Sequence, residues 1–129
     1  MNWTAAAAIV LALAVTFGAF GAHGLRDRLD EYSLGVYEKA VFYHFIHALG
    51  LLAIPILIRG GLIAEKAGGW AAWCLLIGIV FFSGSLYALA ITRVSTLGAI
   101  TPTGGVAFIA GWVILAWAAF SNARPPGGA

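Results

Sequence analysis

The chain has 129 residues, of which 62% are hydrophobic and only 9% are charged, whereas soluble domains are about half apolar and about a quarter charged. So few charged side chains cannot cover the surface of a compact globule. The composition therefore excludes a soluble domain and predicts a protein whose surface faces lipid. The single cysteine, Cys74, excludes a disulfide scaffold. A net charge of +2 without a basic stripe excludes a nucleic-acid partner.

The charged residues form clusters that leave four uncharged windows, at 1–25, 40–58, 67–92 and 94–123. A helix of about 20 residues crosses a hydrocarbon layer about 30 Å thick and satisfies its own backbone hydrogen bonds there. We therefore predict an all-α membrane protein, a compact bundle of four transmembrane helices. The expected spans lie near residues 3–24, 38–58, 70–92 and 102–121, in a single domain over 1–129 with an exposed tail at 122–129.

The first connection, residues 25–37, is predicted to be a partly amphipathic loop. Leu29, Tyr32 and Val36 recur there at helical spacing between acidic residues, a pattern typical of a helix at the membrane interface. Arginine and lysine are divided almost evenly between the two sides of a four-span topology, so the positive-inside rule assigns no orientation to the termini.

Small residues at four-residue spacing occur on three of the predicted spans. Lipid gives helices no hydrophobic reason to associate, and such residues let backbones approach closely. We expect them to pack helices within the bundle or to join copies in an oligomer, although an alanine-rich segment also produces such spacings by chance. The residues are Ala14, Gly18, Ala22, Gly84, Ala88, Ala107 and Gly111.

Three histidines are the most informative polar residues. His44 and His47 are three residues apart in the second span and share a helical face, with Phe45 and Leu49 on the opposite side. We expect the two imidazoles to point into the bundle, because polar groups avoid lipid. His23 ends the first span, and a short connection is expected to bring it close to His44 at one membrane boundary.

These imidazoles can serve two kinds of role. They can bind a metal, haem or a quinone, or relay protons, or they can hydrogen-bond between helices as structural links. No cysteine or carboxylate accompanies them at metal-ligand spacing, which favours the structural role. The sequence therefore leaves a metal undetermined and requires no cofactor.

Other polar residues lie on and beside the third span. Ser83 and Tyr87 share a face at i and i+4 and offer hydroxyl partners to inward histidines. Arg93 ends this span close to Thr101 and Pro102, which read as the cap and first residue of the fourth. Arg93 suits either a lipid phosphate or an arginine that simply reaches the headgroup layer.

Four stretches carry a resemblance to a known family. They are GAFGAHGL at 18–25, YHFIHALGLL at 43–52, FFSGSLYALAIT at 81–92 and ITPTGGVAFIAGW at 100–112. Together they resemble the YgdD-type family of small inner-membrane proteins, domain of unknown function 423, which is related to transmembrane protein 256. The resemblance implies a multi-pass protein of the bacterial cytoplasmic (inner) membrane and no known reaction.

The expected function is that of a small integral membrane protein without enzymatic activity. Its inward histidines and hydroxyls would hold the bundle together, and it would act as an accessory or scaffold subunit or associate with itself. The alternative is a ligand-binding or transport protein that uses His23, His44 and His47 for a metal, haem, quinone or lipid headgroup. An enzyme is disfavoured because no serine lies in a nucleophile elbow and no carboxylate is placed to orient a histidine base.

Overall fold

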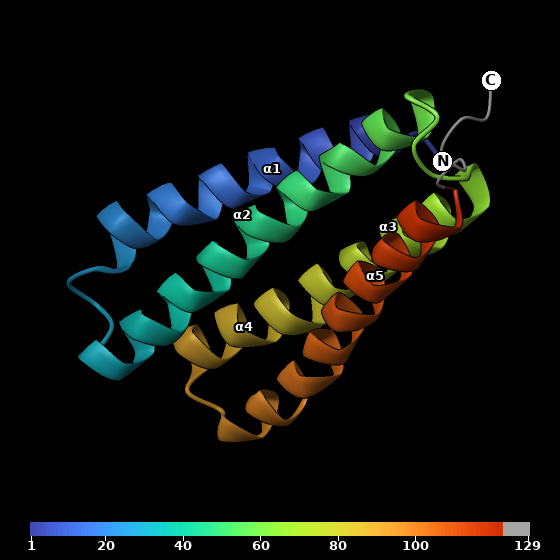
Figure 1. Cartoon of the computed structure of the whole chain (residues 1–129). Helices are drawn as coiled ribbons and strands as arrows, with labels where there is room; N and C mark the ends of the chain where they lie inside the picture. Colours follow the sequence, from blue (N-terminus) through green and yellow to red (C-terminus); the bar gives the residue numbers. More distant parts are fainter. Residues whose placement is uncertain (123–129) are drawn as a thin grey trace.

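A computed structural model describes residues 1–122 of the chain. These residues form helices and connections without any strand (Figure 1). The elements are α1 (Trp3–Phe20), the π-helix η1 (Gly21–Leu25), α2 (Glu31–Arg59), α3 (Glu65–Gly78), the π-helix η2 (Ile79–Ser83), α4 (Gly84–Thr92), the 3₁₀-helix η3 (Ser95–Ala99) and α5 (Thr101–Ser121). Of the tail predicted at 122–129, all but Asn122 lies outside the described residues.

Over the described residues, the elements join into four helical segments long and apolar enough to cross a membrane. They are Trp3–Leu25, Glu31–Arg59, Glu65–Thr92 and Ser95–Ser121. The predicted fold class is thereby confirmed. The second and third segments begin at Glu31 and Glu65, earlier than the expected starts near residues 38 and 70, so the connections are shorter than expected.

The helices are arranged as two antiparallel pairs (Figure 1). In one pair α1 packs on α2, and in the other α5 packs on α3 and η2, while α2 also contacts α3, η2 and α4. The N-terminus, the end of α5 and the α2–α3 connection lie at one end of the molecule, and the other two connections lie at the opposite end. Helix α2 and the α3–η2–α4 helix are therefore central, and α1 and α5 lie at the two sides.

The start of α2 has a local cause. The backbone N–H of Ser33 donates to the Asp30 carboxylate at 2.8 Å, an N-cap contact that satisfies a free amide of the first turn. Hydrogen bonds from the Ser33 side chain and backbone lower the pKa of Asp30, and nearby Arg93 lowers it further. The stretch predicted as an amphipathic loop therefore supplies the first two turns of α2, and only residues 26–30 connect α1 and η1 to it.

Glycines set the close approach of α5 to the third segment. A Cβ on Gly104 would lie 2.2 Å from the backbone nitrogen of Phe82 in η2. A Cβ on Gly78 would lie 2.3 Å from the Phe108 ring, and one on Gly111 would lie 2.9 Å from Leu75. Real Cβ atoms do not tolerate the two shortest of these distances, so the helix backbones pack closely only because glycine occupies these positions.

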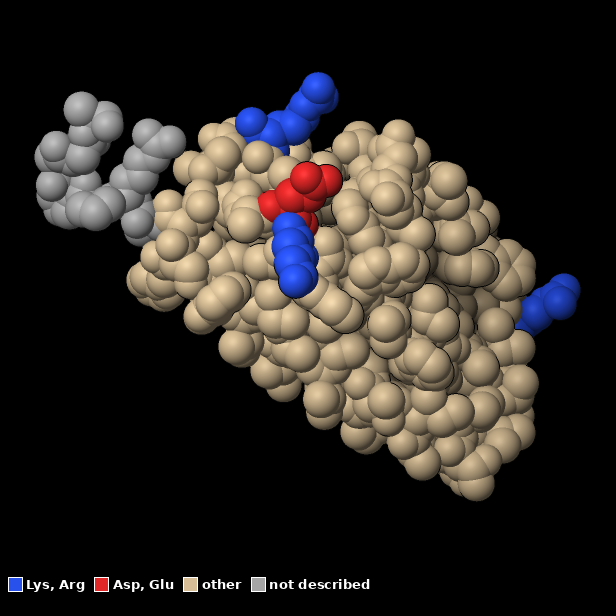
Figure 2. Space-filling model, turned by 90° about the vertical axis from the view of Figure 1, so that its right-hand side faces the viewer, with Lys and Arg blue, Asp and Glu red and all other residues tan. Residues whose placement is uncertain are grey.

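The outer surface is apolar, as expected of a surface that faces lipid. Large hydrophobic side chains that stay exposed include Ile9, Leu13, Phe42, Leu49, Ile56, Val106, Ile109, Val113, Trp117 and Phe120. Figure 2 shows that most of one face carries no charged side chain. Such an area would aggregate in water, but it is the expected surface of a protein within a bilayer.

Candidate functional site

His44 connects three helices by two hydrogen bonds. Its side chain, in α2, is only 3% exposed. Nε2 lies 2.9 Å from the carbonyl oxygen of Val10 in α1, and Nδ1 lies 2.8 Å from the Tyr87 hydroxyl in α4. A carbonyl can only accept, so Nε2 carries the proton and donates to Val10, and the unprotonated Nδ1 accepts from Tyr87. For a neutral imidazole, the geometry thus selects the tautomer with the proton on Nε2.

Two tyrosines extend this contact toward the end of the bundle that carries the α1–α2 connection. The Tyr37 hydroxyl donates to the Phe17 carbonyl of α1, and its ring lies 5.1 Å from that of Tyr87. Tyr37 is 2% exposed. A Cβ on Gly21 would lie 2.3 Å from the Tyr37 ring, so the glycine at the start of η1 makes room for it. Tyr37 and His44 therefore attach α2 to two turns of α1 by the same kind of contact.

His47 is held in a different way. Its Nδ1 donates to the Tyr43 carbonyl of the preceding turn at 2.8 Å. The imidazole stacks on Phe108 of α5, with ring centroids 3.5 Å apart and planes 13° apart, and Trp112 lies against it at 5.8 Å. His47 consequently joins α2 to α5 through aromatic packing, and its hydrogen bond stays within its own helix.

The two serines of the third segment face opposite neighbours. The fully buried Ser83 donates to the Ala40 carbonyl of α2 at 2.8 Å. Ser85 lies 2.6 Å from the Thr101 hydroxyl at the start of α5 and also donates to the Phe82 carbonyl. Residues two apart on a helix point about 200° apart, so this central helix reaches α2 with one hydroxyl and α5 with the other.

We name the six side chains that make these contacts the polar core: Tyr37, His44, His47, Ser83, Ser85 and Tyr87. Among the described residues, no buried side-chain nitrogen or oxygen lacks a hydrogen-bond partner. Five of the contacts run from a side chain of one helix to a group on another. A polar core of this kind stabilises helix association in lipid, where an unpaired polar group is costly.

Comparison with known proteins places the chain in a family. The model of a family described as "Protein of unknown function (DUF423)" matches residues 17–105. The chain belongs to the DUF423 family. This membership confirms the resemblance seen in the sequence, and the matched range includes all six side chains of the polar core.

Relatives of this DUF423 protein are named as membrane proteins. A UPF0382 membrane protein of Staphylococcus epidermidis is 54% identical over 106 residues, which cover 80% of this chain and 82% of the relative. The UPF0382 membrane protein YwdK of Bacillus subtilis is 48% identical over 117 residues, covering 87% and 90%. No solved structure matches the chain. Together with the four spans, these relatives identify a multi-pass protein of the bacterial cytoplasmic membrane.

The three histidines of this DUF423 protein do not meet, contrary to the arrangement expected from the sequence. His23 is exposed in η1, whereas His44 faces Val10, which lies roughly 20 Å from His23 along the helix axis. The reason is the early start of α2, which places His44 deep in the bundle. Within residues 1–122, no three His, Cys, Asp or Glu side chains lie close enough to hold a metal ion, and His23, His44 and His47 are not brought together into one ligand set.

Arg93 also lies apart from the polar core. It ends α4 in the left-handed conformation, with φ 59°, and its N–H donates to the Leu89 carbonyl. Its exposed side chain lines a surface groove together with Asp30. Thr101, expected to cap the last helix, is instead its first residue, and its hydroxyl lies within hydrogen-bond distance of the Ser85 hydroxyl. The Thr101 hydroxyl is therefore engaged within the bundle, and binding of a lipid phosphate by Arg93 stays a prediction.

The predicted packing residues divide into buried and open positions. Ala14 and Gly111 are buried between helices, and a Cβ on Gly18 would lie 3.4 Å from Val41 and 3.7 Å from Phe45 of α2. Ala88 and Ala107 are half-buried, and Ala22 is exposed. A Cβ on Gly84 would meet nothing within 4 Å. The packing roles of Gly21, Gly78 and Gly104 escaped the spacing argument, because each accommodates an aromatic ring or a backbone instead of following a four-residue repeat.

Proposed function

We propose that this DUF423 protein is a noncatalytic structural component of the membrane, which acts as an accessory or scaffold subunit by lateral association with itself or with another membrane protein. This proposal is supported by the hydrogen bonds of the polar core, which link helices to one another. Tyr37, His44 and Ser83 each donate to a backbone carbonyl of a neighbouring helical segment and not of their own. A catalytic site needs such groups directed at a substrate in a pocket, and here they link helices.

The surface supports lateral association as the mode of action. On α4, Gly84 and Ala88 are half-buried one turn apart, and nothing lies within 4 Å of a Cβ built on Gly84. A helix from a second chain can approach a backbone closely at such a position, and close packing is what drives helix association in lipid. The neighbouring exposed side chains, Phe81 and Ile91, extend the contact.

The proposal is tested by measuring association in a bilayer. Chains labelled with donor and acceptor dyes are reconstituted at increasing protein-to-lipid ratio, and energy transfer between them is recorded. Self-association predicts transfer that rises with protein density and falls for Gly84→Leu, while Gly69→Leu on α3, where a Cβ also meets nothing within 4 Å, leaves it unchanged.

A heterologous partner is tested in the native membrane. A photocrosslinking amino acid at position 84 is expected to join the chain to one defined membrane protein, and the same probe at position 69 is not. A chain that stays monomeric at every protein density and crosslinks only to lipid from position 84 would contradict the proposed function.

A further inference from the structure

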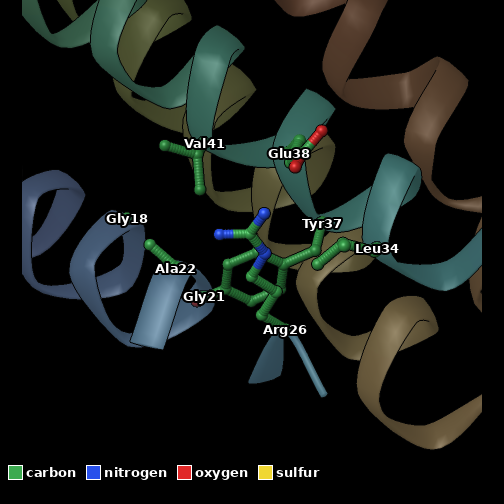
Figure 3. Close-up of a pocket in the computed structure, with 8 residues that line it drawn as sticks. All are labelled: Gly18, Gly21, Ala22, Arg26, Leu34, Tyr37, Glu38 and Val41. Carbon is green, nitrogen blue, oxygen red and sulfur yellow. The ribbon is translucent and has the colours of Figure 1, made fainter. Parts of the chain in front are cut away.

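A groove opens between α1 and α2 at the end of the molecule that carries their connection. It has a volume of about 330 Å³. Figure 3 shows the residues that line it: Gly18, Gly21, Ala22, Arg26, Leu34, Tyr37, Glu38 and Val41. The groove is separate from the hydrogen bonds of the polar core, because the Tyr37 hydroxyl is already engaged by the Phe17 carbonyl and the ring serves only as a wall.

Two opposite charges line this groove. Arg26 comes directly after the first membrane-spanning segment, and its side chain reaches back between α1 and α2 (Figure 3). Glu38, on α2, lies just before the uncharged window at 40–58. Both side chains are exposed. They stand where the hydrocarbon layer gives way to headgroups, so a lipid headgroup is the ligand that this place supplies.

The rest of the groove is small or apolar. Gly18, Gly21 and Ala22 leave the α1 side without bulky side chains, and Leu34 and Val41 provide an apolar wall on α2. Phe20 on α1 and Phe42 on α2 are exposed and lie close in sequence to the groove residues, so they would face the surrounding lipid. A headgroup can therefore enter the groove while its acyl chains remain in the bilayer beside Val41.

We propose that this groove binds the headgroup of a zwitterionic phospholipid with a primary ammonium, phosphatidylethanolamine. The phosphate would accept hydrogen bonds from the Arg26 guanidinium, a donor suited to that group. The ammonium would donate to the Glu38 carboxylate. An anionic lipid without an ammonium satisfies Arg26 but brings its negative charge close to Glu38, so the pair of charges selects the zwitterion.

Native mass spectrometry of the delipidated full chain in mild detergent tests this proposal. The protein is titrated with phosphatidylethanolamine, phosphatidylglycerol and phosphatidylcholine of identical acyl chains. We expect phosphatidylethanolamine to bind about fivefold more tightly than phosphatidylglycerol, which corresponds to about 1 kcal/mol for one exposed ionic contact. Phosphatidylcholine should bind more weakly than phosphatidylethanolamine because its quaternary ammonium has no N–H to donate. Equal affinity for all three lipids overturns the proposal.

Charge variants separate the two contacts. Arg26→Gln should weaken both phosphatidylethanolamine and phosphatidylglycerol about fivefold. Glu38→Gln should weaken phosphatidylethanolamine and strengthen phosphatidylglycerol, because it removes an ammonium acceptor and a repulsive charge together. The controls are Arg28→Gln and Asp27→Asn, exposed charges of the same connection that do not line the groove. If Arg26→Gln behaves as Arg28→Gln does, the groove is not the site.

A steric variant tests the groove without changing charge. Ala22 is exposed and lines it, so Ala22→Met should fill the entrance and weaken phosphatidylethanolamine while leaving the melting temperature unchanged. Undiminished lipid binding by a folded Ala22→Met chain overturns the assignment. Lipid binding is measured independently of oligomeric state, so a negative result here would not bear on the proposed lateral association.

Discussion

His44 stabilises the bundle through its hydrogen bonds to Val10 and Tyr87, so replacing it should lower the free energy of unfolding. His44→Leu keeps the volume of the side chain but removes the hydrogen bonds to Val10 and Tyr87. Hydrogen bonds between membrane helices contribute about 0.6 kcal/mol on average and at most about 1.7. Losing two should therefore lower the free energy of unfolding by about 1–3 kcal/mol.

The measurement is the free energy of unfolding in bicelles by steric trapping. Leu49→Ile is the control, because Leu49 lies on the same helix and is 52% exposed toward lipid, and its cost should stay within about 0.5 kcal/mol. Tyr87→Phe removes one of the same hydrogen bonds, so the double variant His44→Leu/Tyr87→Phe should cost less than the sum of the single variants. Equal tolerance of His44→Leu and Leu49→Ile, or strict additivity in the double variant, would show that these hydrogen bonds do not stabilise the bundle.

Three further predictions concern packing and pH. Gly104→Ala places a methyl group against the backbone of η2 and should lower the free energy of unfolding by about 1–3 kcal/mol or more. The control is Gly69→Ala, whose methyl group meets nothing within 4 Å, and it should be neutral or stabilising by up to about 1 kcal/mol. Similar costs for the two variants would contradict the close contact at Gly104. Phe108→Ala removes the ring stacked on an imidazole and should cost about 3 kcal/mol or more, against little for the exposed Phe120→Ala. The pKa of Asp30 is lower in the folded chain than in the unfolded one, so its carboxylate stabilises the first turn of α2 above about pH 4, and this contribution disappears as the pH falls through the folded-state pKa. An NMR titration of that turn should show the acid transition in the native chain and none in Asp30→Asn, and persistence of the transition in the variant would exclude the cap as its origin.

The number of spans could be predicted from the sequence because charge is excluded from the hydrocarbon layer at every residue. Four uncharged windows therefore correspond to four helical segments. The shared face of His44 and His47 follows from helical periodicity alone, and both side chains are buried. These features depend on position along one helix, which the sequence reports directly.

The pairing between helices could not be predicted in this way. His44 faces Val10 because Asp30 caps α2 and leaves only residues 26–30 to connect it to the preceding helix. The connection over 25–37 that the sequence predicts has a different register and would place His23 near His44. The signal was present, since Asp30 followed by Glu31 in the first turn is typical of a helix N-terminus.

The π-helices and the contacts around them depend on packing. Neither η1 nor η2 contains a proline that would predict a change in the helix. Each lies at a close contact, η1 against the Tyr37 ring and η2 against Gly104 of α5. Ser83 and Ser85 lie two residues apart in the sequence and contact opposite neighbours. Their partners are set by α2 and α5 together, which no single segment encodes.

Side chains of one helix hydrogen-bond to the backbone of another, and solid-state NMR of ¹⁵N-histidine in lipid can detect this contact at His44. We predict that His44 is neutral, with the proton on Nε2 and a through-space correlation between that proton and the Val10 carbonyl carbon. A proton on Nδ1, or an imidazole that exchanges freely with water and shows no contact to α1, would contradict it.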